Sequence, residues 1–254
     1  LNDTSFCRPY QASARQFFAA YVIYKEEKAM LKRSLFSLAS VLGLTQKISR
    51  RGIDEFVRAE AGAGRTLDIG SGHGAYAAYF PNRISVDIAP GPGVDVVADA
   101  HDLSQFPDES FDCVLATEVL EHFHSPHRAI GEMHRVLKKG GKIILTTRFI
   151  FPLHNIPGDY FRFTRYGLEH LFRDFSDVSI REETTTMRTL AVLFERIGFQ
   201  TDTLGSRFLS GAWLLAAKLA GRMSFLITEE YGEVQRQNRM RPIMTSGYFV
   251  VATK

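Results

Sequence analysis

The sequence contains little cysteine, little net charge and no long apolar run, and each shortage excludes a class of protein. Only two cysteines, Cys7 and Cys113, occur among 254 residues, so a disulfide framework and a C-x-x-C site are both excluded, which suits a reducing compartment. No uncharged apolar run reaches the roughly 18 residues of a membrane span, because the nearest candidate, 208–217, ends before Lys218. The first ten residues lack the apolar stretch of an export signal, so we expect a cytoplasmic protein without a transmembrane segment.

The charge pattern bears on the partners of the protein. Lys and Arg number 31 against 28 Asp and Glu, which gives a formal net charge of +3. The basic residues occur as separated pairs, such as Lys32-Arg33 and Arg50-Arg51, instead of forming the dense basic face typical of nucleic-acid binders. We therefore expect no nucleic-acid partner.

Hydrophobic periodicity divides the chain into a helical start, an alternating middle and a mixed end. Apolar residues at three- and four-residue spacing predict helices within 11–60. Short β-branched or apolar runs then predict strands over 66–69, 84–88, 94–98, 111–116 and 143–147. Between the last two strands, the pattern predicts a helix over 127–137, which ends in a basic turn followed by two glycines. Beyond an aromatic loop, the patterns predict helices over 164–175, 187–199 and 208–227, and strands over 177–182 and 247–253. Strands that alternate with helices indicate an α/β fold with a doubly wound, mostly parallel sheet.

The most informative stretch is R-T-L-D-I-G-S-G-H-G-A-Y, at 65–76, in which an apolar strand runs into three alternate glycines and a predicted short helix. Glycine permits the unusual backbone angles and close ligand approach that a nucleotide-binding turn needs, although glycines also punctuate turns that bind nothing. The spacing fits a dinucleotide fingerprint, with Asp87 placed for ribose. Asp68 favours S-adenosylmethionine instead, because its carboxylate would lie close to a pyrophosphate but could pair with an amino acid ammonium.

At this point the sequence resembles the class I S-adenosylmethionine-dependent methyltransferases, in the branch called type 11. The resemblance rests on L-D-I-G-S-G-H-G, S-V-D-I at 85–88, A-D-A-H-D-L at 98–103, F-P-D-E-S-F-D-C-V-L-A-T-E-V-L-E-H-F at 106–123 and R-V-L-K-K-G-G-K-I-I-L at 135–145. It implies a seven-stranded Rossmann-like sheet. It also implies an N-terminal helical cap over 1–60 and a cofactor-binding domain over 61–254, with an acceptor loop at 149–163 and a helical addition at 186–228.

The same resemblance implies the residues that hold S-adenosylmethionine, with S-adenosylhomocysteine as the product. Asp68 and the glycine backbone would hold the methionine part, Asp87 both ribose hydroxyls, and Asp99 the adenine amino group. The full set implied for the cofactor is Asp68, Gly70, Ser71, Gly72, Gly74, Tyr76, Asp87, Ile88, Asp99, Ala100, His101, Glu118 and His122.

The loop after the fifth strand is the predicted acceptor wall, because open α/β sheets bind ligands at the carboxyl ends of their strands. It resembles the P-x-H-x-x-P-x-D-Y-x-R-x-T element of a methyltransferase subgroup that accompanies glycan and cell-envelope biosynthesis. We take His154 as the catalytic base, against a loop-stabilising histidine as the alternative. An Asp159–Arg162 salt bridge is the alternative to acceptor recognition by these two residues. The expected acceptor contacts are Phe151, His154, Asp159, Tyr160 and Arg162.

Two further segments leave alternatives open. The stretch 121–127 holds a glutamate and three histidines but lacks the H-E-x-x-H arrangement, so we expect no metal. The apolar helix 208–227 suits core packing, a homodimer face or a peripheral membrane contact.

The sequence therefore predicts methyl transfer to a small-molecule acceptor, such as a hydroxyl of a sugar, a glycan precursor or another metabolite. Small-molecule nitrogen acceptors remain open, whereas the absence of an N/D-P-P-Y/F motif after the fourth strand argues against the amino-methylating DNA and RNA enzymes. The alternatives of another class are an NAD(P)-dependent oxidoreductase and a non-catalytic protein that binds S-adenosylmethionine.

Overall fold

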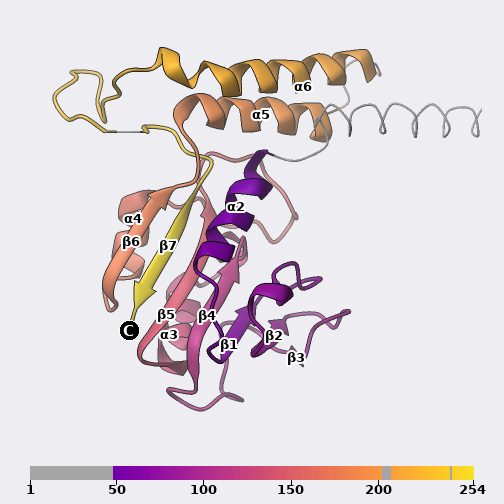
Figure 1. Cartoon of the computed structure of the whole chain (residues 1–254), viewed down its shortest axis with the longest axis vertical. Helices are drawn as coiled ribbons and strands as arrows, with labels where there is room; N and C mark the ends of the chain where they lie inside the picture. Colours follow the sequence, from indigo (N-terminus) through magenta and orange to yellow (C-terminus); the bar gives the residue numbers. More distant parts are fainter. Residues whose placement is uncertain (1–47, 202–206, 241) are drawn as a thin grey trace, which may run out of the picture. The chain divides into compact units, whose positions relative to one another are not determined.

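A computed structural model describes residues 48–201, 207–240 and 242–254 (Figure 1). The helices expected before residue 48 lie outside the described residues. Helix α2, Ile48–Ala59, falls at the end of the predicted helical region and belongs with the sheet to one compact unit, 47–254. The division at residue 60 stays a prediction.

Seven strands form one sheet, in the order β3-β2-β1-β4-β5-β7-β6. Strands β1 to β5 pair parallel with one another, whereas β7 lies between β5 and β6 and is antiparallel to both. The predicted seven-stranded, mostly parallel sheet is therefore confirmed. The strands are β1 Thr66–Ile69, β2 Arg83–Asp87, β3 Val96–Val97, β4 Phe111–Thr117, β5 Leu137–Arg148, β6 Ser176–Glu182 and β7 Gly247–Thr253.

The core lies on both faces of this sheet, because alternate residues of a strand point to opposite sides. On β4, Val114 and Ala116 join the larger apolar cluster, while Cys113 and Leu115 join the smaller one. Residues of α3 and α4 contribute to the larger cluster, and residues of α2 to the smaller one. Helices thus cover both faces, as a doubly wound sheet requires (Figure 1).

The remaining helices follow the predicted order with shifted boundaries. Helix α4 begins after Thr164, whose hydroxyl accepts a hydrogen bond from the Gly167 N–H at 3.1 Å and caps the helix. Helices α5 and α6 pack on each other as a pair (Figure 1). No helix of the described residues is long and apolar enough to span a membrane. The helices are α3 Pro126–Val136, α4 Arg165–Leu171, α5 Thr186–Gln200 and α6 Arg207–Arg222, with single turns at Ala77–Tyr79, Leu120–His122 and Met223–Leu226.

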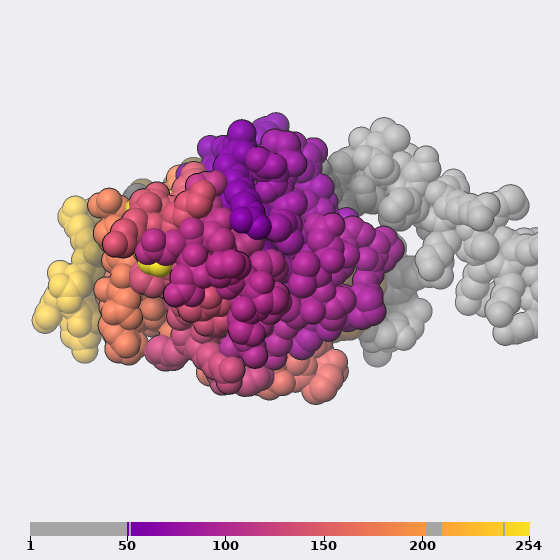
Figure 2. Space-filling model, turned by 90° about the horizontal axis from the view of Figure 1, so that it is seen from below, coloured from indigo at the N-terminus to yellow at the C-terminus, as the bar shows by residue number. Residues whose placement is uncertain are grey.

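The short helix expected after the glycine loop is a single 3₁₀ turn, Ala77–Tyr79. The helix predicted over 127–137 is confirmed to within one residue as α3. The 138–141 segment, however, is not a basic last turn of this helix, because β5 begins at Leu137, which pairs with Phe111 of β4. Strand β5 is therefore longer than the predicted 143–147. Figure 2 views the described residues from below and shows the indigo and magenta segments across the centre of this face.

Candidate active site

A pocket of about 490 Å³ lies at the carboxyl ends of β1, β2 and β4. Strand β1 has β2 on one side and β4 on the other, so the chain order reverses there, and open α/β sheets bind ligands at such a point. The lining residues are Ile69, Gly70, Val86, Asp87, Ile88, Ala98, Asp99, Ala100, His101, Glu118, Val119, His122, Phe123, His124, Asn155, Gly158 and Tyr160. The pocket thus brings together eight of the thirteen predicted cofactor residues and one predicted acceptor contact.

The glycine loop forms one wall, and its glycines are required by backbone geometry. Gly70, Gly72 and Gly74 have φ angles of +67°, +51° and +67°, in the left-handed region that side chains disfavour. A Cβ atom on Gly70 would also lie 2.2 Å from Cγ1 of Val119. Gly70 alone of the three lines the pocket, and Ser71 and Tyr76 also stay outside its lining. Their predicted cofactor contacts stay predictions.

Asp87 ends β2 and faces both the loop and the pocket. Its Oδ2 accepts a hydrogen bond from the Gly72 N–H at 3.0 Å, and its Oδ1 accepts one from Ala89 at 3.3 Å. A carboxylate has about four acceptor positions, so Asp87 can hold the loop and still accept from two hydroxyls. Beside it, Ile88 lines the pocket with 74% of its surface exposed, which leaves an apolar side chain available to a flat ring.

Asp68 does not line the pocket. It is 3% exposed, and its Oδ2 lies 2.7 Å from the Arg83 guanidinium on β2. Burial raises the pKa of Asp68 against the opposing effect of Arg83. The structure therefore gives Asp68 a partner that sequence reasoning missed, although Arg83 on the neighbouring predicted strand was a signal for it. Direct contact between Asp68 and the methionine ammonium stays a prediction.

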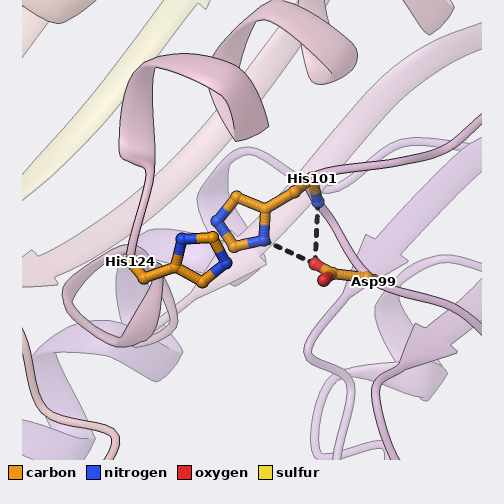
Figure 3. Close-up of side chains that lie close together, drawn as sticks. All are labelled: Asp99, His101 and His124. Carbon is orange, nitrogen blue, oxygen red and sulfur yellow. Dashed lines mark hydrogen bonds and ion pairs between the residues drawn. The ribbon is translucent and has the colours of Figure 1, made fainter.

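Asp99, His101 and His124 line the pocket and lie close together as a cluster (Figure 3). The Asp99 Oδ1 atom accepts from the His101 backbone N–H at 2.9 Å and lies 2.5 Å from His101 Nδ1. His101 Nε2 accepts from the Ser125 N–H at 3.2 Å, which places the ring proton on Nδ1. The His124 ring stacks on His101 with centroids 4.1 Å apart. This cluster offers a carboxylate acceptor beside stacked rings, as recognition of a nucleobase requires.

Glu118 lines the pocket and belongs to a buried ion network that sequence reasoning missed. It follows β4 with φ +56°, accepts from the Thr146 hydroxyl at 2.9 Å and pairs with Arg148. Arg148 is 5% exposed and also donates to Glu183 at 2.8 Å. Glu118 therefore neutralises a buried cation, and its predicted contact with the cofactor stays a prediction.

The acceptor loop is held in shape from within. Arg162 pairs with Asp159 at 2.6 Å and donates to the carbonyls of Phe151, Pro152 and Phe161. The hydrogen bond from Arg162 lowers the pKa of Asp159 to about 2. The internal salt bridge, which was the sequence alternative, is thus present. Acceptor binding by Asp159 and Arg162 stays a prediction.

His154 lies behind the pocket wall in contact with His122, which lines it. The two rings meet edge to face with centroids 4.8 Å apart, and His154 also meets Phe151 at 5.2 Å. Burial lowers the pKa of His154 to about 4, so the free imidazole is neutral and a weak proton acceptor at neutral pH. The base role predicted for it stays a prediction. Tyr160 lines the pocket directly, whereas Phe151 packs under the Arg148 and Arg196 guanidinium groups.

The sheet order and a glycine-walled pocket at its switch point define an α/β domain built to bind a nucleotide-like ligand. Residues 67–145 match the family model described as a methyltransferase domain. This match covers about a third of the chain, and with the methyltransferase relatives it supports a class I S-adenosylmethionine-dependent methyltransferase, whose cofactor is S-adenosylmethionine.

Two curated methyltransferases, one named for its substrate and one uncharacterized, are similar to part of this chain. A phosphatidylethanolamine N-methyltransferase of Cereibacter sphaeroides is 30% identical over 35% of this chain and 53% of its own length. An uncharacterized methyltransferase of Bacillus subtilis is 30% identical over 50% of this chain and 51% of its own length. The chain thus spans about half the length of these relatives.

A solved structure confirms the fold over most of the chain. A methyltransferase of Thermotoga maritima that uses S-adenosylmethionine superposes with a TM-score of 0.52, covering 89% of this chain and 99% of the other. The two sequences are 16% identical, so this likeness shows the fold alone.

Proposed function

We propose that the protein transfers a methyl group from S-adenosylmethionine to a small molecule that binds against the 149–163 loop. The observation that carries this proposal is the pocket, whose lining joins the glycine loop and the Asp87 and Asp99 carboxylates to residues of the acceptor loop. Methyl transfer needs the donor and acceptor aligned and water excluded, and one pocket that reaches both elements meets this need. Bound there, S-adenosylmethionine supplies a methyl group activated by its sulfonium.

Within this proposal, each wall of the pocket takes one part of the cofactor. Asp87 accepts from the ribose hydroxyls, and Asp99 with His101 receives the adenine, since their contacts hold the carboxylate in place. The Gly70 backbone lies where the chain leaves β1, which suits the methionine part.

We propose a hydroxyl of a sugar or another small metabolite as the acceptor, in keeping with the subgroup that the loop sequence resembles. Tyr160 lines the pocket from this loop with 54% of its surface exposed, and its ring can pack against an acceptor. An amine acceptor is the second candidate, because a relative 30% identical is named for N-methylation.

Calorimetric titration with S-adenosylmethionine, S-adenosylhomocysteine and NADPH tests the cofactor assignment without knowledge of the acceptor. We expect micromolar binding of the two sulfur compounds and none of NADPH. Transfer of a radiolabelled methyl group to panels of sugars, phenols and amines then tests the activity. Binding of NADPH alone would overturn the proposal, and binding without transfer to any panel member would favour a non-catalytic protein.

Replacing Asp87 by Ala tests the ribose assignment. We expect the dissociation constant for S-adenosylmethionine to rise at least about 10- to 150-fold, because each hydrogen bond to a charged group contributes roughly 1.5–3 kcal/mol. Asp102→Ala is the matched control, since Asp102 is exposed and lies outside this pocket's lining. Equal affinities of the two variants in the calorimeter would refute the assignment.

Replacing Arg162 by Met tests the acceptor loop. The substitution removes the pair with Asp159 and three bonds to loop carbonyls, so the loop loses its fixed shape. We expect turnover to fall at least about 10-fold at an unchanged affinity for S-adenosylmethionine. Arg173→Met, at an exposed position of the same chain, serves as the control. Full turnover of Arg162→Met would remove the loop from the proposed mechanism.

A further inference from the structure

We infer that Glu121, His122 and His154 form a site for a divalent transition-metal cation of the zinc class at the edge of the pocket. One ligand atom from each of the three lies within 4.8 Å of the other two. The inference deepens the proposed function, on which its catalytic consequence rests, while the binding of a cation can be measured independently.

Glu121 supplies the first reason. Its side chain is fully buried, and the Thr147 hydroxyl donates to Oε2 at 2.8 Å. Its Oε1 is buried and has no hydrogen-bond partner among the described residues. On that side the Nε2 atom of the neutral His154 ring lies 3.8 Å away, beyond hydrogen-bond distance. A buried carboxylate oxygen without a partner is costly, and a bound cation would remove that cost.

Both histidines are oriented as metal-binding imidazoles are. His122 Nδ1 lies 2.6 Å from the Gly158 carbonyl oxygen, to which it donates, so Nε2 carries the lone pair. His154 Nδ1 lies 3.4 Å from Asp159 Oδ2 without a hydrogen bond to it, and its Nε2 lies 3.8 Å from Glu121 Oε1. A carbonyl or carboxylate behind the second ring nitrogen is the usual arrangement of a metal-bound histidine.

The donor set selects the chemistry of the cation. Two imidazoles and one carboxylate suit zinc and its neighbours, whereas magnesium and calcium prefer sites of oxygen alone. Three protein ligands leave a position open in a tetrahedral site, and His122 lines the pocket. A hydroxyl acceptor at that position would lose its proton to solvent more readily. Because the Nε2 lone pair of His154 would bind the cation, His154 could not also act as the general base. The cation would then take over the activation of the hydroxyl.

Closing the site around a cation requires a local movement. Ligands about 2.1 Å from zinc lie roughly 3.4 Å apart in a tetrahedral arrangement, so atoms up to 4.8 Å apart must approach by as much as about 1.4 Å. His154 makes this approach from a loop that exposes Leu153 and Ile156 but keeps its Asp159–Arg162 pair.

The cluster of Figure 3 shows that proximity alone does not make such a site. Asp99, His101 and His124 also offer ligand atoms within 4.8 Å of one another. There, however, both ring nitrogens of His101 are engaged, with Asp99 and with the Ser125 N–H, and Asp99 accepts two bonds from His101. This cluster satisfies itself, whereas Glu121 retains an unpartnered oxygen.

Titration of the tag-free full chain with zinc alone, after treatment with EDTA, tests the inference. We expect one zinc per chain with a micromolar or lower dissociation constant, and two imidazole ligands in the X-ray absorption spectrum of the loaded wild-type protein. Glu121→Gln and His154→Ala should each weaken zinc binding at least 100-fold. His127→Ala is the matched control, because His127 is exposed on α3 and outside the trio. Circular dichroism checks the folding of each variant.

The outcomes separate this inference from the proposed function. Zinc affinity that is equal in wild type and the Glu121→Gln and His154→Ala variants, or an absorption spectrum without imidazole ligands, would overturn the metal site. Full methyl transfer by zinc-free protein would overturn the catalytic consequence and leave the proposed function intact. Zinc bound at the trio, together with no binding of S-adenosylmethionine, would support the site and refute the methyltransferase assignment.

Discussion

Replacing Gly70 by Ala is expected to raise the dissociation constant for S-adenosylmethionine more than 100-fold and to destabilise the fold. The added Cβ would lie 2.2 Å from Cγ1 of Val119, and the residue would keep a φ of +67°. The left-handed backbone costs roughly 1–2 kcal/mol for a residue with a side chain, and overpacking costs typically 1–3 kcal/mol. We expect the free energy of unfolding in urea to fall by about 2–5 kcal/mol, with cofactor affinity followed by calorimetry.

Two variants separate the clash from the backbone strain. Gly72 has a φ of +51°, but no atom lies within 4 Å of its Cβ position, so Gly72→Ala should show the cost of strain alone. Adding Val119→Ala to Gly70→Ala removes the clashing methyl group and should restore part of the stability. Equal losses in Gly70→Ala and Gly72→Ala would show that Val119 does not constrain the loop.

Replacing Arg148 by Met is expected to lower the free energy of unfolding by about 3–5 kcal/mol, because removing one partner of a buried ion pair leaves an uncompensated charge. Arg148 is 5% exposed and faces the carboxylates of Glu118 and Glu183. Its guanidinium also lies 4.3 Å from the Phe151 ring centroid. Methionine keeps the apolar stem of the side chain and removes the guanidinium, so the loss reports the missing charge together with its contacts. Urea unfolding measures it.

The double variant Arg148→Met with Glu183→Gln removes one orphaned carboxylate and should recover part of the loss. Arg165→Met is the matched control, because Arg165 is 39% exposed in its pairs with Glu169 and Glu182, and exposed pairs contribute roughly 0–1 kcal/mol. If Arg148→Met lowers the free energy of unfolding by less than about 1 kcal/mol, solvent must reach the two carboxylates and stabilise their charges when Arg148 is absent.

The sheet and the pocket follow from local patterns, which is why the sequence predicts them. Apolar or β-branched runs mark β1, β4, β7 and the second half of β5, and Gly70 and Asp87 lie where strands end. The start of β5 was predicted at 143 and lies at Leu137, because pairing with Phe111 of β4 decides where this strand begins. Local helix-end patterns in the sequence cannot predict a pairing between residues that lie 26 positions apart.

The ion network and the histidine trio depend on tertiary contacts alone. Arg148 and Glu183 are 35 residues apart, and no spacing rule links them. His154 approaches Glu121 and His122 only because the acceptor loop folds back on the end of β4, with Tyr160 and Phe161 donating to the Glu121 carbonyl. The histidines of 121–127 are visible in the sequence, but the third member of the proposed site, His154, lies on the acceptor loop.

The place of β7 in the sheet sets the order in which the sheet can be completed during synthesis. Among the described strands, β6 pairs only with β7, and β7 also covers the edge of β5. Because β7 follows β6 along the chain, residues 247–253 must leave the ribosome before β6 can join the sheet. Until then the nascent chain carries an unpaired edge on β5, which is an aggregation hazard.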